Sequence, residues 1–195
     1  SFLFSGQFEV ICERAKIQRT MRKLRMSELN RLSVSEFKEE DKFPFRIALD
    51  EVRSLLNVGS VFRTADAFRC EKIYLGGLSP TPSKEMRKTA LGATESVNWE
   101  SLSDGLSSLE ALKKEGYQIW AVEQCEGSVD LRHWEPDLEQ KQIFVFGNEV
   151  SGVSDEVLAF CDGAIEIPQF GTKHSLNIAV SAGVVLWDYI RRIKA

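Results

Sequence analysis

The sequence lacks most of the patterns that mark metal proteins, secreted proteins and membrane proteins. Its two histidines are far apart and no C-x-x-C pair occurs, so a zinc site has little support. Its four cysteines are widely separated, which favours free thiols in a reducing cytoplasm over a disulfide framework. No apolar run reaches membrane-spanning length, and residues 1–10 lack the basic lead of a secretory signal. We therefore expect a cytoplasmic protein that uses no metal and contacts no membrane.

The common nucleotide and nucleophile motifs are missing as well. Residues 171–173 (G-T-K) lack the upstream glycine and the following hydroxyl residue of a phosphate-binding G-x-x-x-x-G-K-[ST] loop. No G-x-G-x-x-G follows the first predicted strand, which disfavours a dinucleotide-binding fold. Ser175 directly follows His174, but adjacent side chains diverge, and no G-x-S-x-G elbow is present. A P-loop enzyme, a dinucleotide-binding enzyme and a serine hydrolase therefore have little support.

Positive charge is scarce except in one stretch near the start of the chain. Residues 14–31 hold seven basic side chains and one acidic side chain, whereas the remainder holds 18 basic and 28 acidic ones. Lysine and arginine displace counterions from phosphates, so a basic arm on an acidic body predicts a nucleic-acid contact. A solvated helix explains the same charges equally well. Charge alone does not decide between these two interpretations.

From residue 46 onward, short apolar runs alternate with helical patterns. The strand-like runs lie at residues 46–50, 72–76, 117–122, 142–147 and 164–168, with a weaker one near 97–99. Buried helix faces are predicted from three sets with helical spacing: Val58, Val61, Phe62, Ala65 and Phe68; Leu102, Leu106, Leu109 and Leu112; Val180, Val184, Trp187 and Ile190. This alternation predicts an α/β domain over residues 44–195, with a mostly parallel sheet and helices on both faces.

Residues 1–43 are predicted to form a short, basic, helical extension. Leu24, Leu29 and Leu32 have the spacing of a helical stripe. Ser33 and Glu36 have capping-box spacing, which predicts the start of another short helix.

Ligands of parallel sheets bind beyond the carboxyl ends of the strands, and here three such junctions are polar and contain glycine. They follow Asp50, Phe146 and Pro168. Taken singly, each polar residue has a structural explanation: Ser175 as a helix N-cap, Glu149 as an acid before a helix, Arg63 as an exposed position. Their occurrence together at the ligand side of the sheet favours a functional site.

The three junctions carry motifs that resemble a known family. The segments are N-V-G-S-V-F-R-T-A-D-A-F at residues 57–68, F-V-F-G-N-E-V-S-G-V-S at 144–154 and I-E-I-P-Q-F-G-T-K-H-S-L-N-I-A-V-S-A-G at 165–183. In this order they resemble the three motifs of the SpoU/TrmH family, the RNA ribose 2′-O-methyltransferases of the SPOUT class. The resemblance covers about residues 46–192, and Val150-Ser151 is its main departure from the expected pattern.

The resemblance implies a C-terminal trefoil knot, S-adenosyl-L-methionine as methyl donor, and a homodimer whose interface lies beside the site. It also implies an RNA substrate. We expect tRNA rather than rRNA, because residues 1–43 contain no clear separate RNA-binding domain. Two alternatives stay open: a non-catalytic RNA-binding relative, and a generic α/β nucleotide-binding enzyme whose motifs match by accident.

The resemblance also implies roles for individual residues. The cofactor-binding positions are Gly147, Ile167 and Leu176. The positions around the reaction centre are Arg63, Glu149, Ser175 and Asn177. The candidate RNA contacts are Asn57, Arg63 and Lys173, together with Arg22, Lys23 and Arg25 of the basic stretch. A guanidinium is a poor base at neutral pH, so we expect Arg63 to grip a phosphate or to stabilise the developing alkoxide.

Overall fold

The computed structural model describes residues 21–194, and the segment up to Leu32 and the body from Ser33 onward are separate compact units. Within residues 21–32 the regular structure is a single 3₁₀ turn, η1 (Met26–Glu28). The prediction of a helix from the spacing of Leu24, Leu29 and Leu32 is therefore wrong. Leu24 and Leu32 are 58% and 45% exposed, and a short stripe that is not buried does not stabilise a helix.

The body is built on a seven-stranded sheet with the order β3-β2-β1-β6-β4-β7-β5. Every pairing between these strands is parallel, as predicted. The strands are β1 (Phe43–Asp50), β2 (Cys70–Gly76), β3 (Trp99–Leu102), β4 (Tyr117–Val122), β5 (Val129–Asp130), β6 (Lys141–Phe146) and β7 (Gly163–Glu166). The prediction missed β5, because two residues are too few for a periodic pattern.

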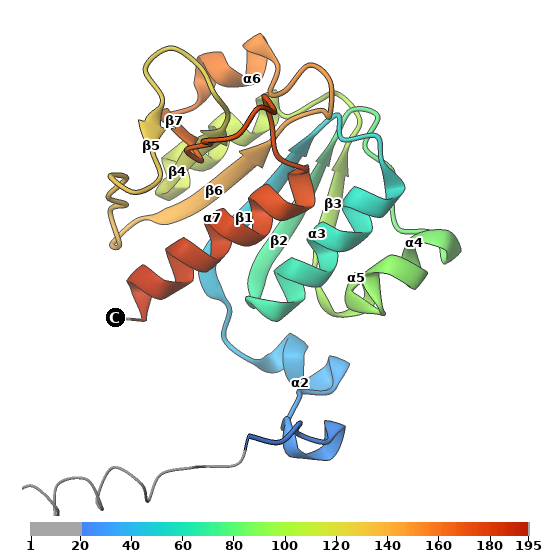
Figure 1. Cartoon of the computed structure of the whole chain (residues 1–195). Coiled ribbons are helices and arrows are strands. Elements are labelled where there is room, and N and C mark those ends of the chain that lie inside the picture. The colour runs from blue at the N-terminus through green and yellow to red at the C-terminus, as the bar shows by residue number, and fades with distance from the viewer. Residues whose placement is uncertain (1–20, 195) are drawn as a thin grey trace, which may run out of the picture. The chain divides into compact units, whose positions relative to one another are not determined.

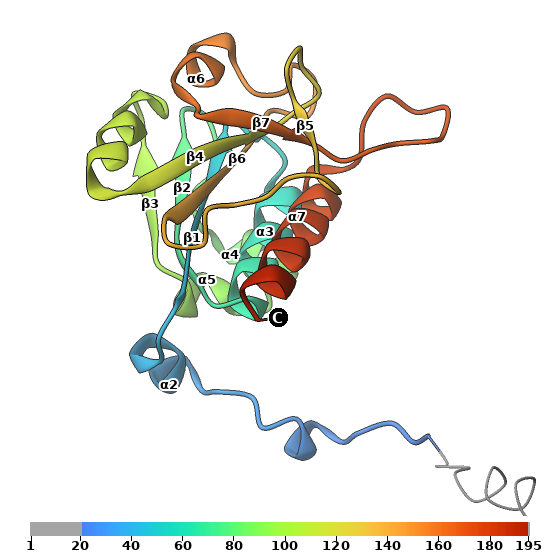
Figure 2. The same cartoon turned by 90° about the vertical axis from the view of Figure 1, so that its left-hand side faces the viewer.

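Helices cover both faces of this sheet, which confirms the layered α/β architecture (Figures 1 and 2). The helices of the body are α2 (Val34–Glu39), α3 (Leu55–Ala67), α4 (Lys84–Ala90), α5 (Ala93–Ser96), η2 (Ser107–Glu115), α6 (Asp155–Phe160) and α7 (Ile178–Ile193), and α2 lies beyond the end of the sheet. On one face α3 and α7 lie side by side, and α4 and α5 pack against α3. On the other face, η2 and α6 bury Leu106, Leu109 and Val157.

Helix α2 begins where the sequence predicted. Ser33 is its N-cap and accepts a hydrogen bond from the backbone N–H of Glu36, while the Glu36 carboxylate accepts from the backbone N–H of Ser33. This reciprocal pair is a capping box. The helix places Phe37 in the hydrophobic core, with 5% of its surface exposed. Residues 33–39 therefore pack as part of the body.

Helix α3 buries the face that the sequence predicted, but α7 does not. Val58, Val61, Phe62 and Ala65 are fully buried on α3. On α7 the buried residues are Ile178, Ala182, Val185, Leu186, Tyr189 and Ile190, whereas Val180, Val184 and Trp187 are 51%, 39% and 59% exposed. The helix is apolar on two sides, and spacing alone cannot tell which side packs against the sheet. An apolar stripe of α7 is thus left on the surface.

The predicted helix through residues 102–112 is also corrected. Leu102 ends strand β3, and the 3₁₀ helix η2 begins only at Ser107. Gly105, with φ of +88°, makes the turn between the two elements. Gly116 ends η2 in the left-handed conformation, with φ of +83°.

None of the helices within residues 21–194 has the length and the apolar character needed to cross a bilayer. Cys70, Cys125 and Cys161 are all free thiols, and Cys12 lies outside the described residues.

Candidate active site

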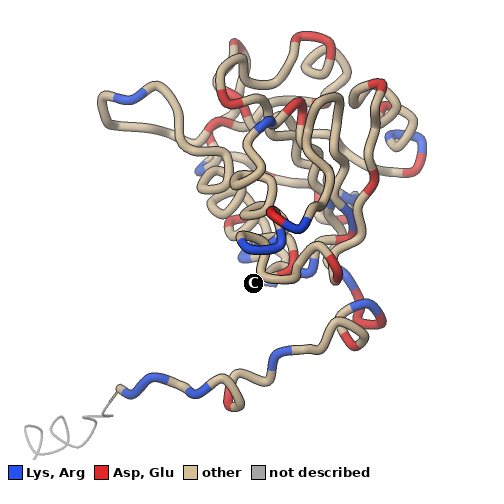
Figure 3. Tube along the Cα trace, turned by 90° about the vertical axis from the view of Figure 1, so that its right-hand side faces the viewer, with Lys and Arg blue, Asp and Glu red and all other residues tan. Residues whose placement is uncertain are grey.

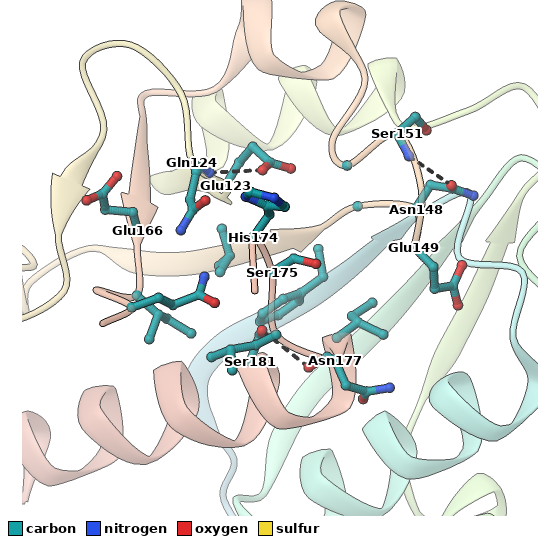
Figure 4. Close-up of a pocket in the computed structure, with 18 of the residues that line it drawn as sticks. Glu123, Gln124, Asn148, Glu149, Ser151, Glu166, His174, Ser175, Asn177 and Ser181 are labelled. Atoms are coloured by element: carbon teal, nitrogen blue, oxygen red, sulfur yellow. Dashed lines mark hydrogen bonds between the residues drawn. The ribbon is translucent and has the colours of Figure 1, made fainter. Parts of the chain in front are cut away.

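A pocket of about 460 Å³ lies at the carboxyl ends of β4, β6 and β7 (Figure 4). The loops that follow these three strands form its walls. They bring together six of the predicted residues: Gly147, Glu149, Ile167, Ser175, Leu176 and Asn177. Figure 4 shows His174 and Ser175 in the middle of the pocket, with Glu149 and Asn177 toward one end and Glu166 toward the other. Of the three junctions predicted to bind a ligand, those after β6 and β7 therefore line the pocket, whereas the junction after Asp50 does not.

Gly147 allows the loop after β6 to fold back on itself. Asn148 and Gly152 exchange both backbone hydrogen bonds, at 2.9 and 3.0 Å, directly after this glycine. A Cβ atom on Gly147 would overlap the backbone of Gly152 and Val153. The close approach thus requires a residue without a side chain at position 147.

The Glu149 carboxylate caps the first turn of α3. It accepts hydrogen bonds from the backbone N–H groups of Arg53 and Ser54, at 3.1 and 3.0 Å, and from Nδ2 of Asn57, at 2.9 Å. Burial opposes ionisation of this carboxyl, but the hydrogen bonds outweigh burial and lower its pKa. At neutral pH Glu149 is therefore an anion that holds α3, and it is poorly placed to act as a general base.

Asn57 connects Glu149 to Asn177. Its Oδ1 accepts a hydrogen bond from Nδ2 of Asn177 at 3.0 Å, while its Nδ2 donates to Glu149. Asn177 in turn is the N-cap of α7, because its Oδ1 accepts from the backbone N–H of Ala179 at 2.9 Å. The N-cap expected at Ser175 lies two residues later. One hydrogen-bond chain thus joins all three sequence motifs.

The loop after β4 also lines the pocket, and no residue of this loop was predicted to do so. Glu123 and Gln124 line the pocket, and a Glu123 carboxylate oxygen accepts from the backbone N–H of Val153 at 2.9 Å. Glu166 also lines the pocket and accepts from the Ser128 hydroxyl at 2.8 Å. The strand-end rule, applied to the strand predicted at residues 117–122, would have found Glu123 and Gln124.

Arg63 and Lys173 lie outside the pocket lining. Arg63 is exposed on α3 and forms no ion pair with any of residues 21–194. Lys173 is exposed in the loop that precedes α7. The structure therefore does not bring Arg63 together with the pocket residues Ser175 and Asn177 within one chain.

Three of the basic candidates lie in the segment that ends at Leu32. Arg22, Lys23 and Arg25 are exposed, and Figure 3 shows this basic stretch with one acidic interruption. That interruption is Glu28, whose carboxylate accepts two hydrogen bonds from Arg22, at 2.6 and 3.0 Å, and one from the backbone N–H of Arg25. Arg22 is thus partly neutralised by Glu28.

Replacing Glu149 with glutamine is expected to lower thermal stability in a pH-dependent way. A lowered carboxyl pKa stabilises the folded state above the ordinary glutamate pKa of about 4.3, and this contribution is lost as the pH falls through the folded value. Loss of the anionic cap should cost about 1 kcal/mol, or roughly 2–4 °C in Tm, at pH 7. The Tm of the Glu149→Gln variant should approach that of the wild type below about pH 4.

Differential scanning fluorimetry from pH 3 to pH 8 measures this effect. Glu126→Gln is the control, because Glu126 is an exposed acid without a hydrogen-bond partner among the described residues. A Tm difference for Glu149→Gln that stays constant across this range would contradict the role of the charged cap.

Comparison with known proteins agrees with this geometry. The model of the SpoU rRNA Methylase family matches residues 44–187. The 23S rRNA (guanosine-2′-O-)-methyltransferase RlmB of Neisseria meningitidis serogroup B is 34% identical over 155 residues, which cover 76% of this chain and 59% of that protein. The chain therefore spans about three fifths of the length of this relative.

Two solved structures have the same fold. The A. aeolicus TrmH/SpoU tRNA modifying enzyme matches with a TM-score of 0.73 and 27% identity, over 83% of this chain and 82% of its own. An AdoMet-bound rRNA methyltransferase from Sinorhizobium meliloti matches with a TM-score of 0.70 and 27% identity, over 82% of this chain and 60% of its own. All residues that line the pocket fall within the range of the family match. The chain belongs to the SpoU rRNA methylase family.

Proposed function

We propose that this protein transfers a methyl group from S-adenosyl-L-methionine to a ribose 2′-hydroxyl of RNA. The observation that carries the proposal is that the second and third motifs meet in one pocket, and that the hydrogen-bond chain Glu149–Asn57–Asn177 joins the first motif to both of them. The relatives support it, since they are named as RNA methyltransferases and one was crystallised with AdoMet.

The pocket fits the proposed cofactor. Its volume of about 460 Å³ lies within the usual range for small-molecule sites. Ile167 and Leu176 offer apolar walls for an adenine ring, and the tight turn at Gly147 leaves backbone groups near the cavity. When bound there, S-adenosyl-L-methionine supplies a methyl group on a sulfonium sulfur, which a ribose 2′-hydroxyl can attack in line.

The chain's own residues position the RNA. Ser175 and Asn177 have polar side chains at the pocket and orient the ribose hydroxyl. Glu149 keeps the loop after β6 attached to α3. Arg63, whose planar guanidinium presents a fork of hydrogen-bond donors, binds the phosphate beside the target ribose or stabilises the developing alkoxide.

The proposed substrate is tRNA, with rRNA as the alternative. The similarity to the A. aeolicus tRNA modifying enzyme extends over most of both chains, which supports this preference. We assign residues 44–195 to the methyltransferase domain, which the family match from residue 44 supports, and residues 1–43 to a basic extension whose last part, from Ser33 onward, packs with the body. Asn57, Lys173, Arg22, Lys23 and Arg25 are the proposed RNA contacts. A reducing cytoplasm suits the free thiols and such a substrate.

The proposed fold includes a C-terminal trefoil knot, and the proposed assembly is a homodimer without a metal. The knotted segments would be the loops after β6 and β7, which meet in one pocket.

The homodimer is supported by the exposed apolar stripe Val180, Val184 and Trp187 on α7, beside a groove of about 540 Å³. Exposed apolar stripes of this kind commonly mark protein interfaces.

Replacing Trp187 with glutamate is expected to convert the homodimer to a monomer. Burying an unpaired carboxylate in an apolar interface costs several kcal/mol, enough to weaken dimerisation at least about 100-fold. Size-exclusion chromatography with light scattering should give about 22.0 kDa, the mass of one chain, in place of twice that value. Leu138→Glu is the control, since Leu138 is 48% exposed and does not belong to the apolar stripe of α7 or line the groove beside it. A Trp187→Glu variant with an unchanged mass would rule out this interface.

Methyl transfer from tritiated S-adenosyl-L-methionine into bulk tRNA and rRNA tests the proposed function. Nuclease digestion and chromatography of the product should then identify a 2′-O-methylated nucleoside. Calorimetry with S-adenosyl-L-methionine separates the alternatives. RNA binding without methyl transfer would indicate a non-catalytic relative, and failure to bind the cofactor would indicate another kind of nucleotide-binding enzyme.

A further inference from the structure

We propose that the outer face of α4, formed by Lys84, Arg87 and Lys88, is a docking surface for the RNA phosphate backbone and continues from Arg63 on α3. The inference rests on the proposed function, because it concerns how the RNA substrate reaches the site. None of these three α4 residues belongs to the cofactor pocket.

The sequence of α4 places its cations on one face. Positions 84, 87 and 88 are separated by three and four residues, so their side chains share one side of the helix. Met86 and Ala90 are buried, with 0% and 1% exposure, whereas Lys84, Arg87 and Lys88 are exposed. The apolar residues thus attach α4 to the body and the three cations are directed to solvent.

Many cations of the body pair with a carboxylate, but Lys84, Arg87 and Lys88 are largely free. Residues 33–195 contain 18 basic and 26 acidic side chains, and basic and acidic segments alternate along the body in Figure 3. Within the described residues of the body, ten cations lie within 4 Å of a carboxylate. Lys84, Lys88 and Arg63 are not among them, and Arg87 makes only an exposed pair with Glu95, at 3.5 Å.

The α4 surface lies on the helix next to the one that carries Arg63. Helices α3 and α4 pack closely at Gly59, where an added Cβ would lie 3.1 Å from a Thr89 carbon and 3.2 Å from a Met86 carbon. Arg63 follows Gly59 by about one helical turn along α3. Figure 1 shows α4 beside α3 on the side away from α7. The helix with the three cations therefore borders the helix with Arg63, on the side opposite α7.

A polyanion is the partner that this surface fits. Glu85 and Glu95 are the acidic residues of α4 and α5, and Glu95 is engaged by Arg87, so positive charge predominates on the outer face. Unpaired lysines that bind phosphates displace the counterions of the RNA. The resulting gain in binding free energy does not depend on the RNA sequence. An RNA held across α4 would bring its backbone to Arg63, which is proposed to grip the phosphate beside the target ribose.

The double variant Lys84→Gln/Lys88→Gln tests the surface. Its matched control is Lys38→Gln/Lys114→Gln, which removes two other exposed lysines that form no ion pair with a described residue. Fluorescence anisotropy with end-labelled bulk tRNA, at several salt concentrations, measures affinity for each protein. At about 100 mM salt we expect roughly 10-fold weaker binding by the test variant, with the slope of log K against log salt reduced by about 1.4–1.8. The control should stay within about 2-fold of the wild type.

The outcomes separate this inference from the proposed function. Equal RNA affinities and salt slopes for the test and control variants would overturn the α4 surface, even if the wild type methylates RNA. A wild-type protein that binds no RNA would overturn it as well. A selective loss in the test variant, with calorimetric affinity for S-adenosyl-L-methionine unchanged, would support it, even if no methyl transfer were detected and the proposed function failed.

Discussion

Replacing Gly147 with alanine is expected to weaken S-adenosyl-L-methionine binding at least about 100-fold. The added methyl group would overlap backbone atoms of Gly152 and Val153, and backbone cannot move aside as the end of a flexible side chain can. The loop after β6 would have to open, and with it the paired hydrogen bonds between Asn148 and Gly152. This loop forms one wall of the pocket, so the cofactor would lose a wall.

Isothermal titration calorimetry with S-adenosyl-L-methionine measures the loss, and circular dichroism verifies that the variant is folded. Gly171→Ala is the matched control. Gly171 lies in the loop before α7, and a Cβ atom there would meet no atom within 4 Å. Its affinity should therefore remain within about 2-fold of the wild type. A Gly147→Ala variant that binds the cofactor normally would show that this loop does not form the binding wall.

The sequence predicted the sheet better than it predicted which helix faces are buried. Strands β1, β2, β4, β6 and β7 lie where buried apolar runs occur, because a parallel sheet covered on both faces needs such runs. Helix α7 has apolar residues on two sides, and only the packed structure shows that Tyr189 is buried while Trp187 is exposed. Hydrophobic spacing shows that a helix has an apolar side, but it does not show which other element covers that side.

The pocket could be located from the sequence, but its hydrogen bonds could not. The polar junctions after β6 and β7 do meet, as the rule for parallel sheets predicts. Glu149, however, binds groups that lie 92 to 96 residues earlier in the chain. Asn57 joins two motifs through the two ends of one amide group. Contacts of this kind depend on tertiary geometry, which no local pattern encodes.

Replacing Arg63 with alanine is expected to reduce methyl transfer by about 100- to 1,000-fold, a typical loss when a group that stabilises developing charge is removed. Affinity for S-adenosyl-L-methionine should stay unchanged, because Arg63 does not line the pocket. Arg63→Lys should also lose at least about 10-fold in methyl transfer, since lysine keeps the charge but lacks the planar fork that engages a phosphate through two hydrogen bonds.

Single-turnover methyl transfer, measured alongside cofactor calorimetry, separates these effects. Arg191→Lys is the control, because Arg191 is an exposed arginine of α7 that pairs only with Asp188 in the described chain. Full activity in Arg63→Lys would show that the guanidinium geometry is not needed. A parallel loss of cofactor affinity in Arg63→Ala would show that Arg63 contributes to cofactor binding in the pocket.

The position of Arg63 also predicts how two subunits cooperate. It is exposed on α3 and lies outside the pocket lining of its own chain. Helix α3 packs beside α7, whose apolar stripe is the proposed dimer interface. We therefore expect Arg63 to serve the pocket of the partner subunit. In a mixed dimer of Arg63→Ala and Gly147→Ala chains, the Arg63→Ala subunit keeps an intact pocket and receives Arg63 from its partner. Such a dimer, isolated with two different affinity tags, should recover about half of the wild-type methyl transfer, because one of its two sites is complete. If the mixed dimer is as inactive as either parent, Arg63 acts within its own chain and must swing toward the pocket when RNA binds.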